Sequence, residues 1–366
     1  MRRALEAARR GWGDTHPNPM VGALIVENGR VVADGYHARA GEPHAEIMAL
    51  KNLGRPPAPG AALYVTLEPC STTGQTPPCT EAIICAGIKN VVVGATDPNP
   101  KHAGRGLTLL RKAGIEVEEG VLADECTDLN FIFNHWITND TPLIAGKIAT
   151  TLDGRVATRS GESKWITGPA ARCDVMRWRR LFPIVAVGAG TVLADDPQLT
   201  SRLGKTVWCP QRFVFDRTLR TVTDPLPRVY SDEFCKDTAV FTGARPDPQK
   251  EAQLARREVD VLSAYTDDDD WVYGLREFCE NAGVPAVLIE GGPTLLSAFL
   301  QLGQLDYLFA YRAPKFVADD GAISAFRGRF CDRLKDAYTL ADVRHATLGD
   351  DQLMRGRVVY PARGGE

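Results

Sequence analysis

The feature that most constrains this chain is a set of one histidine and two cysteines that could hold a single metal ion. His44 stands in the sequence Pro-His-Ala-Glu, and Cys70 and Cys79 follow it. One imidazole and two thiolates leave the fourth position of a tetrahedral zinc open for water, which is typical of a catalytic site. On a helix, Glu46 would point about 200° away from His44, so we expect it to reach that water from the side. The fold must therefore bring these segments together.

The cysteine spacing departs from the general signature of zinc nucleobase deaminases. That signature combines H-x-E with P-C-x-x-C, whereas Cys70 and Cys79 are nine residues apart. The segment 71–78 between them is rich in Thr, Gly and Pro, which form turns that can bring the second thiol back. Two prolines before Cys79 predict a helix start, whose positive end favours a thiolate. Free cysteines are usually buried packing residues, but this combination predicts zinc ligation.

Length and cysteine content indicate two domains in a reducing compartment. A chain of 366 residues exceeds what one ordinary core holds. Nine cysteines are an odd number, and they lack the spacing of a disulfide framework. No apolar stretch has the length of a signal peptide core or the roughly 18 residues of a membrane helix. We expect a cytoplasmic protein with no membrane partner.

The charge distribution argues against nucleic-acid binding. Residues 1–141 contain 13 Lys and Arg against 16 Asp and Glu, and the remainder of the chain is neutral. A nucleic-acid-binding domain normally has a basic excess. The sequence therefore disfavours a deaminase that edits tRNA or DNA, and it favours a small-molecule substrate.

The first part of the chain alternates strands and helices. A hairpin around Asn28-Gly29 is followed by elements that alternate in type, which predicts an α/β sandwich. A zinc site at the carboxyl ends of its strands fits the usual position of ligands in open α/β sheets. The expected strands are 21–26, 31–36, 62–67, 90–94 and 115–118, and the expected helices are 3–10, 45–53, one starting at Cys79, and 105–113.

Loops next to these elements carry polar side chains whose role the sequence leaves open. Asn18 and Asn99 lie in proline-rich loops, and an amide offers both a donor and an acceptor to a base edge. Alternatively, these asparagines make only turn hydrogen bonds. His16, His37 and His102 are interpreted as capping or surface residues with no metal role.

A second α/β domain is expected after a linker at 138–142, which divides the chain into 1–141 and 142–366. The apolar strands 184–187 and 286–290 each run into glycines that open a helix. Such junctions can hold a phosphate on backbone N–H groups, although neither is the dinucleotide fingerprint G-x-G-x-x-G. The acidic run 267–270 is expected to be solvated and the tail 363–366 to be disordered.

At this point the sequence resembles a known family, the bifunctional riboflavin-biosynthesis proteins. These join a pyrimidine deaminase to a pyrimidine reductase, and the wide cysteine spacing is a mark of the family. The resemblance covers residues 1–361. In the first part it rests on His16-Pro17-Asn18-Pro19-Met20-Val21-Gly22, Pro43-His44-Ala45-Glu46, Glu68-Pro69-Cys70 and Gly74-Gln75-Thr76-Pro77-Pro78-Cys79. In the second part it rests on Leu152-Asp153-Gly154, Gly161-Glu162-Ser163-Lys164-Trp165-Ile166-Thr167, Gly190-Thr191-Val192-Leu193-Ala194-Asp195-Asp196-Pro197 and Glu290-Gly291-Gly292-Pro293.

The resemblance implies a cytidine-deaminase-like α/β/α sandwich, a dihydrofolate-reductase-like α/β domain, and their ligands. In the first site, the resemblance implies a zinc ion bound by His44, Cys70 and Cys79. It also implies that Glu46 carries the proton and that Asn18 binds the substrate. The implied substrate-binding residues of the second site are Ser163, Arg179, Leu199, Arg202 and Glu290, with Lys147 and Asp153 near the reacting centre. The implied NADPH-binding residues are Ala149, Trp165, Thr191, Asp195 and the run Gly292, Pro293, Thr294, Leu295, Leu296, Ser297 and Ala298.

Two positions depart from the family pattern. Arg217 stands where the family often has a small hydroxyl residue near the cofactor, and a guanidinium there would suit a 2′-phosphate. The segment 315–320 replaces a glycine-rich stretch, which leaves the shape of that loop open.

The activity implied by the resemblance has two steps. Hydrolytic deamination of 2,5-diamino-6-(5-phosphoribosylamino)pyrimidin-4(3H)-one is followed by NADPH-dependent reduction of the ribosyl chain to ribityl. Arg179 and Arg202 are expected to bind the phosphate, because their forked donors match phosphate oxygens; alternatively, Arg179 is a solvated helix residue. A homo-oligomer is expected.

Two other classes of function remain open from the sequence. One is a nucleoside or nucleobase deaminase whose second domain is non-catalytic and serves assembly; binding of NADPH would exclude it. The other is a non-enzymatic zinc protein with a binding module, which an intact zinc without ammonia release would favour.

Overall fold

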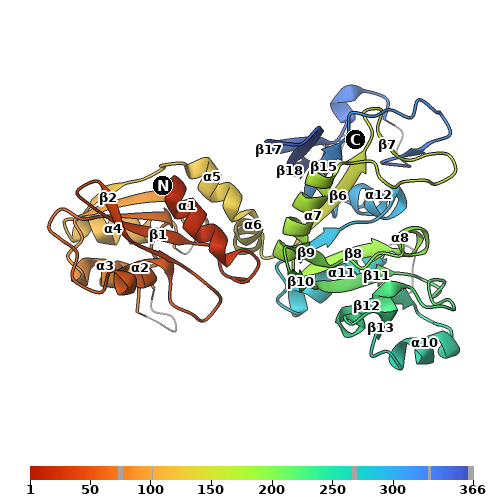
Figure 1. Ribbon diagram of the computed structural model, residues 1–366, viewed down its shortest axis with the longest axis horizontal. Helices are drawn as coiled ribbons and strands as arrows, with labels where there is room; N and C mark the ends of the chain where they lie inside the picture. Colours follow the sequence, from red (N-terminus) through yellow and green to blue (C-terminus); the bar gives the residue numbers. More distant parts are fainter. Residues whose placement is uncertain (73–76, 101, 266–269, 329–330, 362–366) are drawn as a thin grey trace, which may run out of the picture. The chain divides into compact units, whose positions relative to one another are not determined.

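The computed structural model describes the chain except residues 73–76, 101, 266–269, 329–330 and 362–366. It divides into two compact units, Met1–Thr141 and Pro142–Glu366 (Figure 1). Part of the predicted 71–78 loop, most of the acidic run 267–270 and the tail 363–366 lie outside the described residues.

The first unit is built on a five-stranded sheet in the order β2-β1-β3-β4-β5. The hairpin β1–β2 and the pair β1–β3 are antiparallel, whereas β3, β4 and β5 are parallel. The strands are β1 (Gly22–Glu27), β2 (Arg30–Tyr36), β3 (Ala62–Leu67), β4 (Asn90–Ala95) and β5 (Glu116–Glu118). The helices are α1 (Arg2–Ala8), α2 (Ala45–Leu53), α3 (Cys79–Cys85), α4 (Arg105–Lys112), α5 (Ala123–Leu129) and α6 (Phe131–Asn139), and the 3-10 turn η1 (Arg9–Gly11) follows α1.

Two glycines let helices approach both faces of the β1–β2 hairpin. A Cβ on Gly22 would lie 2.0 Å from the Ala4 carbonyl oxygen of α1, and one on Gly35 would lie 2.3 Å from the Ala45 carbonyl oxygen of α2. Gly35 pairs with Ala23, the residue next to Gly22, so the two glycines face opposite sides of the sheet. Figure 1 shows α1 and α2 on these two sides. Helix α2 is thereby held tightly against the sheet at the end that carries His44.

The second unit contains a nine-stranded sheet in the order β13-β12-β11-β8-β14-β6-β15-β18-β17. The strands from β13 to β15 are parallel to their neighbours, and β18 and β17 complete the sheet antiparallel. They are β6 (Leu143–Thr150), β8 (Ile184–Gly188), β11 (Gln211–Phe215), β12 (Thr238–Gly243), β13 (Asp260–Tyr265), β14 (Ala286–Ile289), β15 (Tyr307–Arg312), β17 (Thr339–Leu348) and β18 (Asp351–Val359). Two small sheets pair β9 (Ser201–Leu203) with β10 (Thr206–Trp208) and β7 (Arg155–Ala157) with β16 (Ile323–Ser324).

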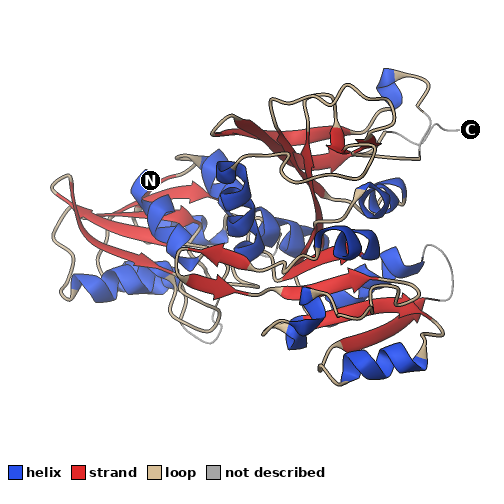
Figure 2. Cartoon of the chain, turned by 45° about the vertical axis from the view of Figure 1, so that its right-hand side comes forward, coloured by secondary structure: helices blue, strands red, loops and turns tan. Residues whose placement is uncertain are grey.

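Helices alternate with the parallel strands of this sheet along the chain, and Figure 2 shows helices packed beside the strands. Strands β8 and β14 are almost entirely apolar, as expected for strands whose two faces are both covered. The main hydrophobic core of the second unit includes Ile184, Ala186, Val287 and Ile289 from these strands. The helices are α7 (Pro169–Leu181), α8 (Ala189–Asp195), α9 (Arg228–Ser231), α10 (Pro248–Ala255), α11 (Asp270–Asn281) and α12 (Pro293–Gln301), with 3-10 turns η2 (Cys235–Asp237) and η3 (Leu334–Asp336).

Most of the predicted elements are confirmed to within one or two residues. The helix 45–53 and the strand 62–67 have the expected bounds. The first predicted helix, 3–10, is instead α1 followed by η1. Within the described residues, none of the helices has both the length and the apolar character needed to cross a membrane.

Candidate functional site

His44, Cys70 and Cys79 come from three different elements and meet at one point of the first unit. His44 is the residue that caps the start of α2, Cys70 follows β3, and Cys79 is the first residue of α3. The Nδ1 atom of His44 lies 3.2 Å from the Cys79 sulfur and 3.5 Å from the Cys70 sulfur. The backbone N–H of Cys79 donates to the Cys70 sulfur at 3.3 Å.

These three side chains fit a zinc ion. Zinc bonds of about 2.3 Å to sulfur and about 2.0 Å to nitrogen place tetrahedral ligand atoms roughly 3.5 Å apart. The nitrogen and the two sulfurs all lie within 4.8 Å of one another. Within the described part of the chain, this is the one group of three His, Cys, Asp or Glu side chains that is so close. Three protein ligands leave the fourth position for water, as the sequence predicts.

The surroundings shift the pKa values of the two thiols in opposite directions. A hydrogen bond with Cys79, helped by His44, lowers the pKa of Cys70 to about 4. The neighbouring Cys70 side chain, together with burial, raises the pKa of Cys79. A lowered pKa favours the thiolate form of Cys70, which is the form that binds a metal.

Glu46 lies in the first turn of α2 and is 3% exposed. The expectation that it points about 200° away from His44 is wrong in its premise, because His44 caps the helix in an extended conformation and is not part of it. The carboxyl group lies close enough to Cys70, His44 and Cys79 for all three to influence its pKa. Burial raises the pKa of Glu46 to about 7, which suits a group that both takes up and releases protons.

A second carboxylate, Glu68, connects the zinc-ligand segment to a neighbouring loop. It is buried and accepts hydrogen bonds from the backbone N–H groups of Asp97, Gly104 and Gly106 at 3.1, 2.9 and 2.8 Å. A Cβ on Gly106 would lie 2.2 Å from the Pro69 carbonyl oxygen. Glu68 therefore fixes the loop beside Cys70, a role that the sequence does not reveal.

Asn18 is connected to the same site through His37. The Asn18 amide nitrogen lies 3.2 Å from His37 Nε2, and His37 Nδ1 lies 3.3 Å from the carbonyl oxygen of Pro43. The His37 ring stands edge-on to the His44 ring with centroids 5.4 Å apart. The interpretation of His37 as a capping or surface residue is wrong, because this side chain is 2% exposed and lies within the site.

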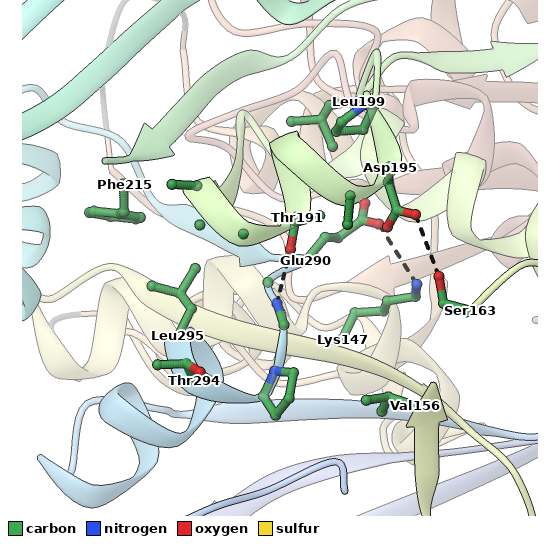
Figure 3. A pocket seen from close by; sticks show the side chains of 18 of the residues that line it. Lys147, Val156, Ser163, Thr191, Asp195, Leu199, Phe215, Glu290, Thr294 and Leu295 are labelled. Carbon is green, nitrogen blue, oxygen red and sulfur yellow. Dashed lines mark hydrogen bonds and ion pairs between the residues drawn. The ribbon is translucent and has the colours of Figure 1, made fainter. Parts of the chain in front are cut away.

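The second unit contains a cavity of about 1180 Å³ at the carboxyl ends of β8, β11 and β14 (Figure 3). It exceeds the usual range for a single small ligand, roughly 300–1,000 Å³, so it has room for a cofactor and a substrate together. Most of the residues implied for this site line the cavity. They are Lys147, Ala149, Ser163, Trp165, Arg179, Thr191, Asp195, Leu199, Arg202, Arg217, Glu290, Gly292, Pro293, Thr294, Leu295 and Ala298.

Three of the implied residues do not line the cavity. Leu296 is fully buried in the core, and the hydroxyl of Ser297 accepts a hydrogen bond from the backbone N–H of Arg327. Both lie in α12, where only one face of a helix can border a cavity. Asp153 instead accepts hydrogen bonds from the N–H groups of Val317 and Ala318, so it fixes the 315–320 loop.

A buried cluster of charges lies in the cavity wall. Arg179 donates to both oxygens of Glu290 at 2.6 and 3.0 Å. Lys147 Nζ lies 3.8 Å from Glu290 Oε2 (Figure 3). Burial lowers the pKa of Lys147. Burial alone would raise the pKa of Glu290, but the charge and hydrogen bonds of Arg179, together with Lys147, lower it overall. Arg179 is thus not a solvated helix residue, since it is mostly buried and paired.

The arginines of the cavity differ in how their charge is compensated. Arg179 is paired with Glu290, and Arg228 with Asp196 at 3.0 Å. Arg202 donates to the neutral oxygens Thr200 Oγ1 and Gln198 Oε1 at 2.7 and 3.3 Å, and no described carboxylate forms an ion pair with it. Burial and the charges of Arg179 and Arg228 lower the pKa of Arg202. An anion would relieve this repulsion.

The glycine junctions of the cavity fit a phosphate-bearing cofactor. A Cβ on Gly190 would meet no atom within 4 Å, and one on Gly292 would meet only Thr191 Oγ1 at 3.7 Å. A ligand can therefore approach the backbone at both junctions. The Gly292 N–H donates to Thr191 Oγ1 at 3.2 Å and links them (Figure 3). Trp165 is 63% exposed and stacks with Arg172, whose guanidinium lies 4.5 Å from the ring centroid.

Comparison with known families gives a match for each unit. Residues 142–353 match the family described as the RibD C-terminal domain. Residues 1–95 match the cytidine and deoxycytidylate deaminase zinc-binding region. The first match covers more than half of the chain.

Similar proteins cover nearly the full length. The riboflavin biosynthesis protein RibD of Bacillus amyloliquefaciens is 40% identical over 351 residues, which are 96% of this chain and 93% of the relative. RibD of Aquifex aeolicus is 42% identical over 96% of this chain and 95% of the relative. Among solved structures, Acinetobacter baumannii RibD is 38% identical with a TM-score of 0.78, covering 98% of this chain and 97% of that one. The Thermotoga maritima diaminohydroxyphosphoribosylaminopyrimidine deaminase/5-amino-6-(5-phosphoribosylamino)uracil reductase is 36% identical with a TM-score of 0.79, over the same shares of each chain.

Proposed function

This chain belongs to the RibD family of bifunctional riboflavin-biosynthesis enzymes, and we propose that its two activities are divided between its two units. It combines a cytidine-deaminase-like α/β/α sandwich with a dihydrofolate-reductase-like α/β fold, and it uses zinc and NADPH. It deaminates 2,5-diamino-6-(5-phosphoribosylamino)pyrimidin-4(3H)-one and reduces the ribosyl chain of the product to ribityl. A deaminase with a non-catalytic second domain is not favoured. We assign the deaminase to residues 1–141 and the reductase to residues 142–366.

The convergence of His44, Cys70 and Cys79 beside a buried carboxyl group is the observation that carries the deaminase assignment. Bound zinc supplies the Lewis acidity that makes water nucleophilic near neutral pH. Glu46 accepts the proton of the attacking water and delivers it to the departing amine. The carboxyl group is buried near the three ligands, where it can reach the attacking water without binding the metal itself.

In the second unit, residues of the cavity wall position the two reactants. NADPH supplies the hydride, and the chain contributes the placement and the electrostatics. The open backbone at Gly190 and Gly292, with Thr191 between them, supports these residues as the cofactor's phosphate site. Lys147, Arg179 and Glu290 form a charged group deep in the cavity that would surround the reacting end of the substrate.

Arg202 is the proposed partner for the substrate phosphate. Arg179 is already bound to Glu290 on two of its nitrogens and to the Thr200 carbonyl oxygen on the third. Arg202 lies in the same wall without a described carboxylate partner, and a forked donor matches phosphate oxygens. Arg217, also in the wall, is proposed to bind the 2′-phosphate of NADPH.

One preparation of the purified chain tests the assignment. Zinc content, ammonia release and NADPH oxidation are measured with the diaminopyrimidinone substrate. We expect zinc in a ratio of about one per chain, ammonia release without NADPH, and NADPH oxidation only after deamination. Truncation to 1–141 should retain ammonia release alone. NADPH oxidation by that fragment would contradict the assignment.

We also propose a homo-oligomer in the cytoplasm. Strand β17 forms an exposed edge of the large sheet, and an edge strand offers unpaired backbone groups for association. All nine cysteines are free thiols, as a reducing compartment requires. Light scattering of the full chain tests the first proposal, and a single-chain mass would contradict it.

A further inference from the structure

His37 has a hydrogen-bonding arrangement that fixes the orientation of a neighbouring amide. The oxygen of the Pro43 carbonyl can only accept, so the His37 Nδ1 atom 3.3 Å away must carry the proton. In the neutral ring, Nε2 is then an acceptor. The amide group of Asn18 meets Nε2 at 3.2 Å, and only its NH₂ end can donate to that lone pair. The tautomer of His37 therefore decides which way Asn18 turns.

The backbone on both sides holds this arrangement in place. His37 N–H donates to the Val21 carbonyl oxygen at 2.9 Å, and Asn18 N–H donates to that of Thr15 at 2.8 Å. A Cβ on Gly11 would lie 2.6 Å from the His37 carbonyl oxygen, so the chain packs closely there. The His37 side chain is 2% exposed and has little room to rotate.

The orientation leaves the amide oxygen of Asn18 available. No described residue hydrogen-bonds Asn18 Oδ1, and Asn18 is only partly buried. Pro43 directly precedes the zinc ligand His44, whose ring contacts that of His37. The chain of contacts from Pro43 through His37 to Asn18 thus connects the amide to the segment that carries His44 and Glu46.

We propose that His37 is a positioning residue for deamination: it holds Asn18 so that Oδ1 accepts a hydrogen bond from an amino group or ring N–H of the pyrimidine. This inference rests on the proposed deaminase function. It assigns no proton transfer and no metal binding to His37. If the imidazole were absent, the Asn18 amide could turn over and present its NH₂ group to a donor on the substrate, which would repel it.

A double-mutant cycle distinguishes positioning from general support of the fold. The full chain is compared as wild type, His37→Phe, Asn18→Ala and the double variant, with deaminase kcat/KM, zinc content and reductase activity measured on each. We expect His37→Phe to lower deaminase kcat/KM roughly 10- to 100-fold, as for a misplaced buried hydrogen bond, with zinc and reductase activity retained. In the Asn18→Ala background, His37→Phe should have little further effect. His37→Gln keeps a polar group at the position, so its deaminase kcat/KM should fall less than that of His37→Phe. The control is His345→Gln, a substitution of an exposed histidine.

The tautomer is measured directly by long-range ¹H–¹⁵N NMR of the histidine-labelled full chain. There are six histidines, and the His37 signals are those lost in His37→Gln. We expect the proton on Nδ1. A proton on Nε2, an equal loss from His37→Phe in both backgrounds of the cycle, or loss of zinc from His37→Phe would each overturn the proposal. Failure of the zinc-loaded wild type to release ammonia would instead reject the proposed function, and the NMR result would still decide the orientation of Asn18.

Discussion

At Glu46, burial and a neighbouring sulfur set the acidity of one carboxyl group. The side chain is 3% exposed, and burial raises its pKa to about 7. A carboxyl group in this range can bind and release a proton within one catalytic cycle, whereas an exposed glutamate would stay ionised.

Glu46→Gln is expected to abolish deamination while leaving zinc bound. The amide has nearly the same shape but cannot accept the proton of water, and loss of such a group typically costs 10²- to 10⁴-fold. Ammonia release and zinc content are measured together. Glu42→Gln is the matched control, because Glu42 is an exposed glutamate four residues earlier that pairs with Arg39. Deamination by Glu46→Gln at the wild-type rate would refute the role of Glu46.

Arg202→Ala is expected to raise the KM of the reductase step roughly tenfold or more, because a charge-assisted hydrogen bond to the phosphate is lost. The deaminase kinetics of the same preparation should stay unchanged. Arg256→Ala, at an exposed position of the same unit, controls for loss of a positive charge. An equal loss in both activities would count against a phosphate role in the second site.

Arg217→Ser tests recognition of the cofactor. If Arg217 pairs with the 2′-phosphate, the variant should bind NADPH roughly tenfold more weakly while its affinity for NADH, which lacks that phosphate, stays the same. Fluorescence titration with each cofactor measures both affinities. A parallel loss for NADPH and NADH would place Arg217 outside phosphate recognition.

At the scale of elements, the first site depends on how helix ends and strand ends meet. Helices α2 and α3 begin at the site, and β3 ends near it. His44 directly precedes α2, Cys79 is the first residue of α3, and Cys70 follows the end of β3. The sequence predicted the bounds of α2 and the start of α3, because proline and the H-x-E pattern mark them locally. It did not predict that His44 caps α2 in an extended conformation. The capping residue and the first helical residue are neighbours in the chain, so a local pattern does not distinguish them.

Glu68→Ala is expected to destabilise the first unit. The substitution leaves the three backbone N–H groups that Glu68 binds without their acceptor, and buried unsatisfied donors cost about 1–3 kcal/mol each. Water that reaches the loop would satisfy some of these donors and reduce their summed cost. We therefore expect the free energy of unfolding to fall by about 3 kcal/mol. Urea unfolding measures the change. The control is Glu116→Ala, at an exposed position of β5, which should change the free energy of unfolding by less than about 0.5 kcal/mol. An equally small effect of Glu68→Ala would show that other contacts hold the loop.

The helical periodicity of α12 determines which of its residues border the cavity. The resemblance implied that the whole run 292–298 touches the cofactor, but Leu296 and Ser297 face the interior. Successive residues of a helix point about 100° apart, so a continuous run cannot border one cavity.

At the scale of the whole molecule, the chain has two sites that differ in whether they need a metal ion. The first requires a metal held by thiolates, and the second is a cavity in which no such cluster is found among the described residues. The two activities should therefore respond separately to removal of the metal.

Chelation of zinc is expected to abolish ammonia release and to leave NADPH oxidation with the deaminated substrate intact. Thiolate and imidazole ligands bind zinc in competition with protons and with chelators. Both activities are measured before and after dialysis against a chelator, and again after zinc is restored. Loss of the reductase activity on chelation, with recovery on zinc, would show that the second site depends on the first.

The sequence alone determined the ligand types, the alternation of strands and helices, and the glycine junctions, because each is set by neighbouring residues. The tertiary structure decided the rest. It showed that Arg179 is paired with Glu290, which follows the distant strand β14. It also showed that Asp153 fixes a loop outside the cavity and that His37 contacts both Asn18 and Pro43. Except for His37 and Pro43, which are six residues apart, these contacts join residues from separate parts of the chain. No local pattern encodes such contacts, because they form only when the sheets bring the strand ends together.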